Sequence, residues 1–206
     1  MKAQLPTVAA IFVLAFSLIG CEPADCVYPL YKPTDTASDD RLLGTWQRVD
    51  TKDVSNSEKN WRWNFVRSKD DKVYDFTLRA VGQKGGFAAN VRLVQIGDYL
   101  FADFSGDFNR TLGSDADKLD NLIAYPALPA HGISRIWIEK DSLRIHFLKD
   151  DWTRDQAKEG KLALAHLDLE GYPLITAKTE DLRTFMQAHA EDTDALSENY
   201  DLERVK

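Results

Sequence analysis

The sequence predicts a mainly β domain, an antiparallel meander with a C-terminal helix packed on it. Three observations lead to this fold class. Apolar and polar residues alternate with period two in several short runs, glycine-containing turns separate these runs, and one late segment has helical spacing instead. The pattern fits a closed barrel or an open curved sheet, and both remain open at this level.

The domain begins with a predicted strand at 42–49, and the alternation is clearest from Trp61 onward. Trp61, Trp63 and Phe65 alternate with polar residues, which is typical of a half-buried strand. Two further alternating runs, 74–80 and 87–93, flank a glycine-containing turn and predict a β-hairpin.

The next run, 99–104, is apolar on both faces, which predicts a central or enclosed strand. A long irregular stretch follows from 105 to 130. The chain then returns to strand character at 133–139 and 143–147, separated by a Lys-Asp turn. Together these segments predict a meander of hairpins.

Two short helices are expected after the hairpins. The segment 150–158 begins with aspartates, one of which we expect as N-cap, and Gly160 lies just past its end. Strand character returns at 162–169. Thr179 is the expected N-cap of the second helix, whose apolar residues at i, i+3, i+4 and i+7 are Leu182, Phe185, Met186 and His189. Acidic residues accumulate afterwards and predict an acidic tail of doubtful order.

The N-terminus has the composition of a secretory signal. Lys2 supplies a positive start, and the 13 residues from Val8 to Gly20 are apolar apart from Ser17. This stretch is too short to span a bilayer. Ordinary cleavage after Gly20 requires a small residue at −3, but Leu18 is bulky.

Leu18-Ile19-Gly20-Cys21 resembles the lipobox of bacterial lipoproteins. The resemblance implies that the Cys21 thiol receives a diacylglyceryl group and becomes the acylated N-terminus after cleavage. It also implies a membrane-anchored protein of the cell envelope, because acyl chains together hold a protein firmly. Glu22 after the cysteine favours the outer membrane, facing the periplasm, or the cell membrane in a host without an outer membrane. The alternative is a secreted protein with a Cys21–Cys26 disulfide.

The chain divides into a signal peptide (1–20), a proline-containing tether (21–41), one β-rich domain (42–190) and an acidic tail (191–206). Within the tether, residues 27–31 are apolar enough to dock on the domain instead. Removal of 1–20, which contains one lysine and no acid, shifts the formal charge from −7 to −8. Such a charge disfavours nucleic acid and anionic lipid surfaces as partners. With Cys21 acylated, Cys26 is the only thiol left, and we expect it to be exposed in the tether.

Gly44-Thr45-Trp46 resembles the G-x-W sequence that starts the first barrel strand of lipocalins. The resemblance implies a calycin-like barrel in which Trp46 plugs the closed end, with an interior cavity at about eight strands. The long stretch 105–130 and the two helices depart from that pattern, so the open sheet stays an alternative.

Catalytic motifs of hydrolases, metalloproteases, P-loop and dinucleotide-binding proteins are absent from the sequence, and no cofactor or metal is expected. Asp103 is unusual because it shares a strand face with Tyr99 and Phe101, where an unpaired carboxylate is costly. His131 lies where the long stretch re-enters a strand. The two side chains are a candidate acid–base pair, but an arginine salt bridge to Asp103 is the commoner arrangement.

Two functions follow from these features. A binding module would enclose a small apolar or amphipathic molecule, and an envelope lipoprotein without ligand would use the same aromatics as a solid core. The candidate binding residues are Trp46, Trp61, Trp63, Phe76, Asp103 and His131. An enzyme is the third possibility and requires Asp103 and His131 to converge in a cleft. The sequence identifies no protein partner.

Overall fold

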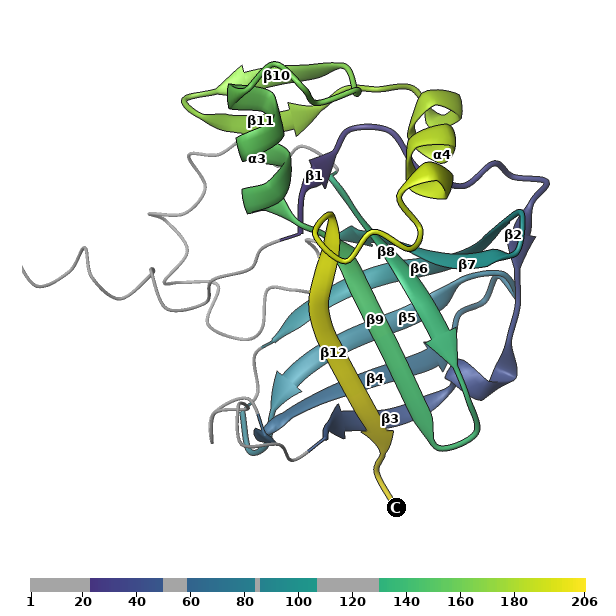
Figure 1. The fold of residues 1–206 in the computed structure, drawn as a ribbon. Coiled ribbons are helices and arrows are strands. Elements are labelled where there is room, and N and C mark those ends of the chain that lie inside the picture. The colour runs from purple at the N-terminus through teal and green to yellow at the C-terminus, as the bar shows by residue number, and fades with distance from the viewer. Residues whose placement is uncertain (1–22, 50–58, 84–85, 107–129) are drawn as a thin grey trace, which may run out of the picture.

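The computed structural model describes residues 23–49, 59–83, 86–106 and 130–206, and its centre is a closed antiparallel β-barrel (Figure 1). Each strand pairs with the next along the chain, and the last strand pairs with both β3 and β9, while β9 also pairs with β8. The eight barrel strands are β3 (Gly44–Arg48), β4 (Trp61–Arg67), β5 (Tyr74–Ala80), β6 (Phe87–Ile96), β7 (Tyr99–Gly106), β8 (His131–Ile138), β9 (Ser142–Leu148) and β12 (Leu196–Arg204). The barrel alternative is therefore confirmed.

Strand β12 closes the barrel and comes from the segment expected to be an acidic tail, so that expectation is wrong for 196–204. Leu202 is buried in the barrel interior and lies opposite Arg48 of β3 and Leu143 of β9. Asp201 and Glu203 alternate with Leu202 and face outward. The acids are the polar half of a period-two strand, which a count of charged residues does not distinguish from a solvated tail.

One end of the barrel is plugged around Trp46, as the G-x-W resemblance implied. The indole is fully buried, and its Nε1 donates a hydrogen bond to the carbonyl of Leu42, in the 3₁₀ helix η1 (Asp40–Leu42), at 2.9 Å. The Arg204 guanidinium stacks 4.1 Å from the ring and donates to the carbonyls of Arg41 and Leu43. Gly44 has a φ of +121°, and a Cβ there would lie 2.6 Å from Nη1 of Arg204. Glycine is therefore required beside this plug.

A second layer covers the outside of the barrel over β6, β7 and β8 (Figure 1). It consists of α3 (Asp150–Lys158), a hairpin of β10 (His166–Leu169) and β11 (Tyr172–Ile175), α4 (Thr179–Ala188) and the N-terminal segment 23–31. Strand β7 separates this layer from the barrel interior. Phe101 packs outward and Phe104 inward, which confirms the strand predicted to be apolar on both faces.

Both helices occupy their predicted ranges, but the predicted caps are wrong. The N-cap residues are Lys149 and Lys178, and neither forms a side-chain capping bond. The Thr179 hydroxyl instead donates to the carbonyl of Pro29 at 2.8 Å and connects α4 to the N-terminal segment. The predicted apolar stripe is buried at Leu182, Phe185 and Met186.

The described part of the predicted tether, 23–41, packs on the barrel instead of extending from it. Strand β1 (Asp25–Cys26) pairs with β8 and β11, and β2 (Thr36–Ala37) pairs with β6. Ala24, Cys26 and Leu30 are buried. The prolines interrupt regular secondary structure in this segment. The apolar residues between them are nevertheless numerous enough to hold the segment on the barrel, because each is buried separately. Cys21 and the predicted signal peptide 1–20 lie outside the described residues.

Within the described ranges, the structure has no helix that is long and apolar enough to cross a membrane.

Candidate functional site

Five aromatic side chains form a closed circuit of ring contacts across the barrel interior, and we call them the aromatic belt: Trp63, Phe76, Phe104, Phe147 and Tyr200. Successive ring centroids are 5.5, 5.5, 5.1 and 5.9 Å apart, and Tyr200 returns to Trp63 at 4.8 Å. These separations and the tilted or edge-to-face geometries are those that aromatic pairs favour. The belt therefore fills the cross-section of the barrel.

Small residues on the intervening strands leave room for the belt. Ala89 of β6 lies opposite Phe76, and Gly132 of β8 lies opposite Phe104. A Cβ at Gly132 would lie 3.5 Å from Pro23 and 3.8 Å from the Phe147 ring, both ordinary contact distances, so alanine would also fit at this position. Rings from non-neighbouring strands thus meet across the interior.

The two sides of the belt differ in exposure. Toward the Trp46 plug the interior is closed by fully buried side chains, including Phe65 and Tyr74. Toward the other end, where β4 and β6 begin, Trp61 is half-buried and Phe87 is 44 % exposed. Phe87 contacts Phe76 edge-on at 6.2 Å, so the aromatic surface continues from the belt to the rim.

A positive charge accompanies the belt near this end. The guanidinium of Arg48, at the end of β3, lies 4.7 Å from the centroid of the Tyr200 ring. Cation–π contacts of this kind favour a guanidinium on an aromatic surface. An apolar floor with an adjacent cation suits an amphipathic molecule better than a purely apolar one.

Asp103 and His131 converge on the outer face of the barrel wall. The Asp103 side chain is 1 % exposed, and its Oδ1 lies 2.6 Å from Nδ1 of His131. Its other oxygen accepts a hydrogen bond from the backbone N–H of Leu30 at 2.7 Å. Among the described residues no arginine forms an ion pair with Asp103, so the partner is the histidine and not an arginine.

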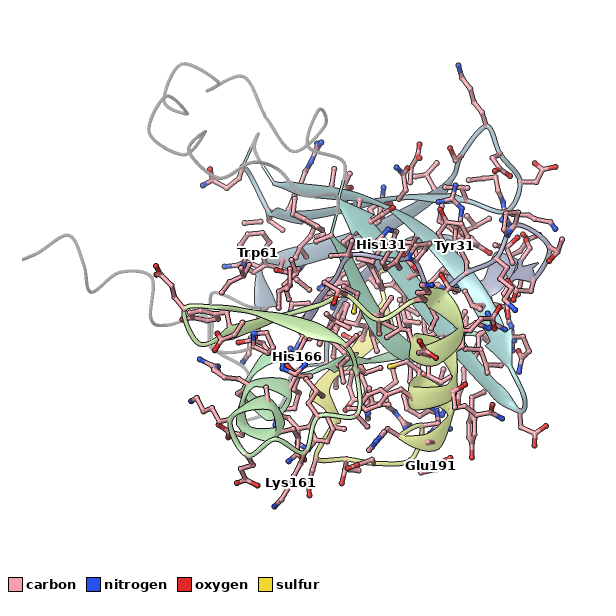
Figure 2. All side chains as sticks on the ribbon, turned by 90° about the horizontal axis from the view of Figure 1, so that it is seen from above. Tyr31, Trp61, His131, Lys161, His166 and Glu191 are labelled. Carbon is pink, nitrogen blue, oxygen red and sulfur yellow. The ribbon has the colours of Figure 1, made fainter. Side chains whose placement is uncertain are left out.

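The N-terminal segment lies beside this pair. Cys26 is the Cα partner of His131 across the β1–β8 pairing, and the Tyr31 ring is 6.3 Å from the imidazole. The Arg92 guanidinium lies 4.5 Å from the Tyr31 ring centroid. In Figure 2, His131 lies between Tyr31 on its right and Trp61 farther away on its left.

The Cys26 thiol is buried, which corrects the expectation of an exposed tether cysteine. Burial raises the pKa of this thiol strongly, and the negative charges of Asp103 and Asp25 raise it further. The neutral thiol is therefore the stable form, and it is a poor nucleophile.

The hydrogen bonds of Asp103 and His131 suit a structural role, in which they hold neighbouring segments together, better than a catalytic role. Both carboxylate oxygens and Nδ1 already have hydrogen-bond partners, and the imidazole is 11 % exposed. Only Nε2 is left for chemistry with a substrate. The carboxylate instead joins three segments distant in sequence: β7, β8 and the N-terminal segment.

The structure divides the predicted site residues between two places. Trp63 and Phe76 belong to the belt, Trp61 lies at its exposed end, and Trp46 lies below it in the plug. Asp103 and His131 are outside the barrel wall and belong to a separate cluster. The site residues predicted from the sequence did not include Phe104, Phe147, Tyr200, Phe87 or Arg48. The alternation in β6, β7 and β9 could have identified the three phenylalanines, whereas nothing local marked Tyr200 or Arg48.

No group of three or more His, Cys, Asp or Glu side chains that could hold a metal ion occurs in the described ranges. The fold and the belt together define the class of protein: a closed eight-stranded antiparallel meander barrel with an internal aromatic cluster, consistent with a calycin-like fold. No family model, no curated protein and no solved structure matches this chain.

Proposed function

We propose that this chain is a lipid-anchored protein of the bacterial cell envelope whose barrel binds a small apolar or amphipathic molecule at the exposed end of the aromatic belt. The aromatic belt is the observation that carries the binding part of the proposal. The lipobox resemblance at Leu18–Cys21 carries the anchoring part.

The ligand would rest on the belt instead of passing through it. Trp61 and Phe87 extend the aromatic surface to the rim, so an apolar group gains contact on more than one side. Burial of such a group on aromatic faces is favourable both through the hydrophobic effect and through ring geometry. Arg48 would attract an anionic head group on the same molecule.

A fluorescent probe tests the binding site. N-phenyl-1-naphthylamine, titrated into residues 21–206 with Cys21 replaced by serine, is expected to bind saturably. The double variant Trp61→Ala/Phe87→Ala should bind about tenfold more weakly, since each lost ring contact is worth about 0.5–1.5 kcal/mol.

Tyr28→Ala is the matched control, because Tyr28 is 45 % exposed but lies on the N-terminal segment, outside the barrel. Its affinity for the probe should equal that of the parent chain. Equal affinity in the Trp61/Phe87 double variant would place the probe elsewhere and contradict the proposed site.

The anchor is tested separately in a bacterial host. The unmodified chain is expected in the membrane fraction, with acyl mass on the peptide that begins at Cys21. Cys21→Ser should move it to the soluble envelope fraction.

The alternative function is a structural or interaction lipoprotein without ligand. Full burial of Trp46, Phe65 and Phe76 favours it, because these rings act as a solid core. Absence of saturable probe binding together with normal membrane anchoring would support this alternative.

A further inference from the structure

The β10–β11 hairpin presents apolar side chains to solvent. Leu167, Leu169 and Tyr172 are 56, 50 and 57 % exposed. Leu169 lies directly opposite Tyr172 in the antiparallel pairing, and Leu167 lies two residues before Leu169, so the three side chains share one face. An exposed apolar cluster on a short hairpin at the edge of a sheet indicates an interaction surface. We call these three residues the hairpin patch.

The start of the described chain lies against the hairpin patch. Pro23, Leu169 and Tyr172 line one small hollow with a volume of about 80 Å³. Pro23 forms a β-bridge with Lys149, the N–H of Ala24 donates to Leu148, and the N–H of Val27 donates to Ile175 of the hairpin. The chain is therefore fixed to the domain from Pro23 onward.

Covalent geometry then limits where an anchor on Cys21 can lie. Cys21 precedes Pro23 by two residues, and two residues span at most about 7 Å. Acyl chains on Cys21 would enter the bilayer close to the hairpin patch. A tether of 21 residues was expected to hold the domain away from the membrane. Because the chain is attached to the domain from Pro23 onward, only the two residues before it can act as a spacer.

We propose that the hairpin patch docks on the bilayer that holds the Cys21 acyl chains, so that the domain lies on the membrane surface. This inference rests on the acylation in the proposed function. Leucine and tyrosine side chains suit the interface, because the aliphatic groups enter the acyl boundary and the phenol hydroxyl stays with the head groups. The chain is acidic overall, and the Arg154 guanidinium already lies over the Tyr172 ring at 5.2 Å, so the three side chains enter the interface by apolar burial and need no negative head group.

Docking in this way also orients the barrel. In Figure 1 the closed end of the hairpin and the barrel end where β4 begins both point to the left. Trp61, at that barrel end, lies toward the same side in Figure 2. With the closed end of the hairpin against the bilayer, the exposed end of the aromatic belt would lie on the membrane side, and membrane lipid would be the nearest source of its ligand.

Hydrogen–deuterium exchange tests the docking. The acylated chain is placed in neutral phosphatidylcholine vesicles and compared with residues 21–206 carrying Cys21→Ser in solution. Exchange in peptides covering 166–175 should slow at least tenfold on the vesicles, while peptides covering the Trp46 plug stay unchanged. The triple variant Leu167→Ser/Leu169→Ser/Tyr172→Ser should stay in the membrane fraction. Its hairpin peptides should no longer exchange more slowly on the vesicles. Val66→Ser, at a 51 % exposed position on β4, should retain the slowing.

Unchanged exchange in the hairpin on vesicles would overturn the proposal. Slowing that appears without vesicles as protein concentration rises would also overturn it and indicate a second copy of the chain as the occupant. If Cys21 is not acylated in the host, a lipid-maleimide coupled to Cys21 of residues 21–206 supplies the anchor. Failure of acylation and failure of docking are thereby distinguished.

Discussion

The barrel interior and the outer layer are two cores on opposite faces of the same wall, and different interactions hold them. In the interior, aromatic rings from five strands contact one another, and the neighbouring residues are aliphatic. In the outer layer, buried or half-buried polar side chains join segments far apart in sequence. Arg135 donates to the carbonyl of Ala190 and pairs with Glu191 at 2.9 Å, and Arg183 pairs with Asp35 at 2.7 Å.

The difference predicts different responses to mutation. An apolar interior tolerates changes of shape as long as its volume is filled. A buried polar group must instead find a particular partner, and removal of that partner leaves an unsatisfied group in a dry environment. The interior should therefore control global stability, whereas the outer layer should open locally when one polar contact is lost.

The largest effect is expected in the belt. Phe76→Ala removes a ring that contacts Trp63, Phe65 and Phe104, and should lower the free energy of unfolding by about 3–5 kcal/mol, measured by urea denaturation. Phe87→Ala is the control at the exposed rim and should cost less than about 1 kcal/mol. Equal losses in the two variants would contradict a packed interior.

The next largest effect is expected for the hydrogen bonds of Asp103, which hold the outer layer on the barrel wall. Asp103→Ala leaves His131 and the Leu30 N–H without their partner and should cost about 2–3 kcal/mol. Hydrogen exchange in residues 24–31 should accelerate more than exchange in the barrel. A double-mutant cycle with His131→Ala should give a coupling of about 1–3 kcal/mol.

Asp98→Ala, in the exposed β6–β7 turn, is the control for Asp103 and should leave both stability and exchange unchanged. Uniform acceleration across the whole Asp103→Ala chain would instead indicate that the two cores open as one unit.

A smaller and more local effect is expected at Cys26. The raised pKa keeps the Cys26 thiol protonated at pH 8, and burial excludes Ellman's reagent. The reagent should therefore react on the order of a hundredfold more slowly with the folded chain than with the chain unfolded in urea. The measurement uses the Cys21→Ser variant. Asp103→Ala should accelerate the reaction by opening the N-terminal segment. A disulfide-linked dimer of the folded Cys21→Ser chain would refute the buried assignment.

The smallest effect is expected at His146 on the outer face of β9. Its Nε2 is buried and has no hydrogen-bond partner among the described residues, and its ring contacts Trp137 at 4.7 Å. Burial lowers the pKa of His146, with the positive charge of Arg144 contributing. The unfolded chain, with a pKa near 6.5, therefore binds a proton more readily than the folded chain, and stability falls as pH drops through and below that value.

His146→Phe should remove this part of the pH dependence and add up to about 1 kcal/mol of stability at pH 7.5, because no unsatisfied nitrogen remains. Urea denaturation at pH 7.5 and pH 5.0 measures both quantities. If the free energy of unfolding changes between pH 7.5 and pH 5.0 by the same amount in His146→Phe as in the parent chain, other groups cause the pH dependence.

Much of the barrel follows from local sequence. Residues 74–80 were predicted as a strand and form β5, and β4, β6, β7, β8 and β9 overlap their predicted ranges closely. The anomaly of Asp103 was visible because its position on the strand placed a carboxylate on an apolar face. The partner of Asp103 was not fixed, because nothing local distinguishes His131 from a nearby arginine.

The sequence by itself determined which residues of each strand point inward, because alternation depends on only a few neighbouring residues. The resemblance of Gly44-Thr45-Trp46 to the lipocalin G-x-W implied the plug position of Trp46. Only the tertiary structure decided that β12 closes the barrel, that 23–41 packs on the wall, and that Asp103 joins Leu30 to His131. The reason is sequence distance: Leu30 lies 73 residues from Asp103, and Arg204 lies 161 residues from the Leu43 carbonyl that it binds. Contacts across such distances leave no periodic pattern in the sequence, because tertiary packing decides which residues become neighbours.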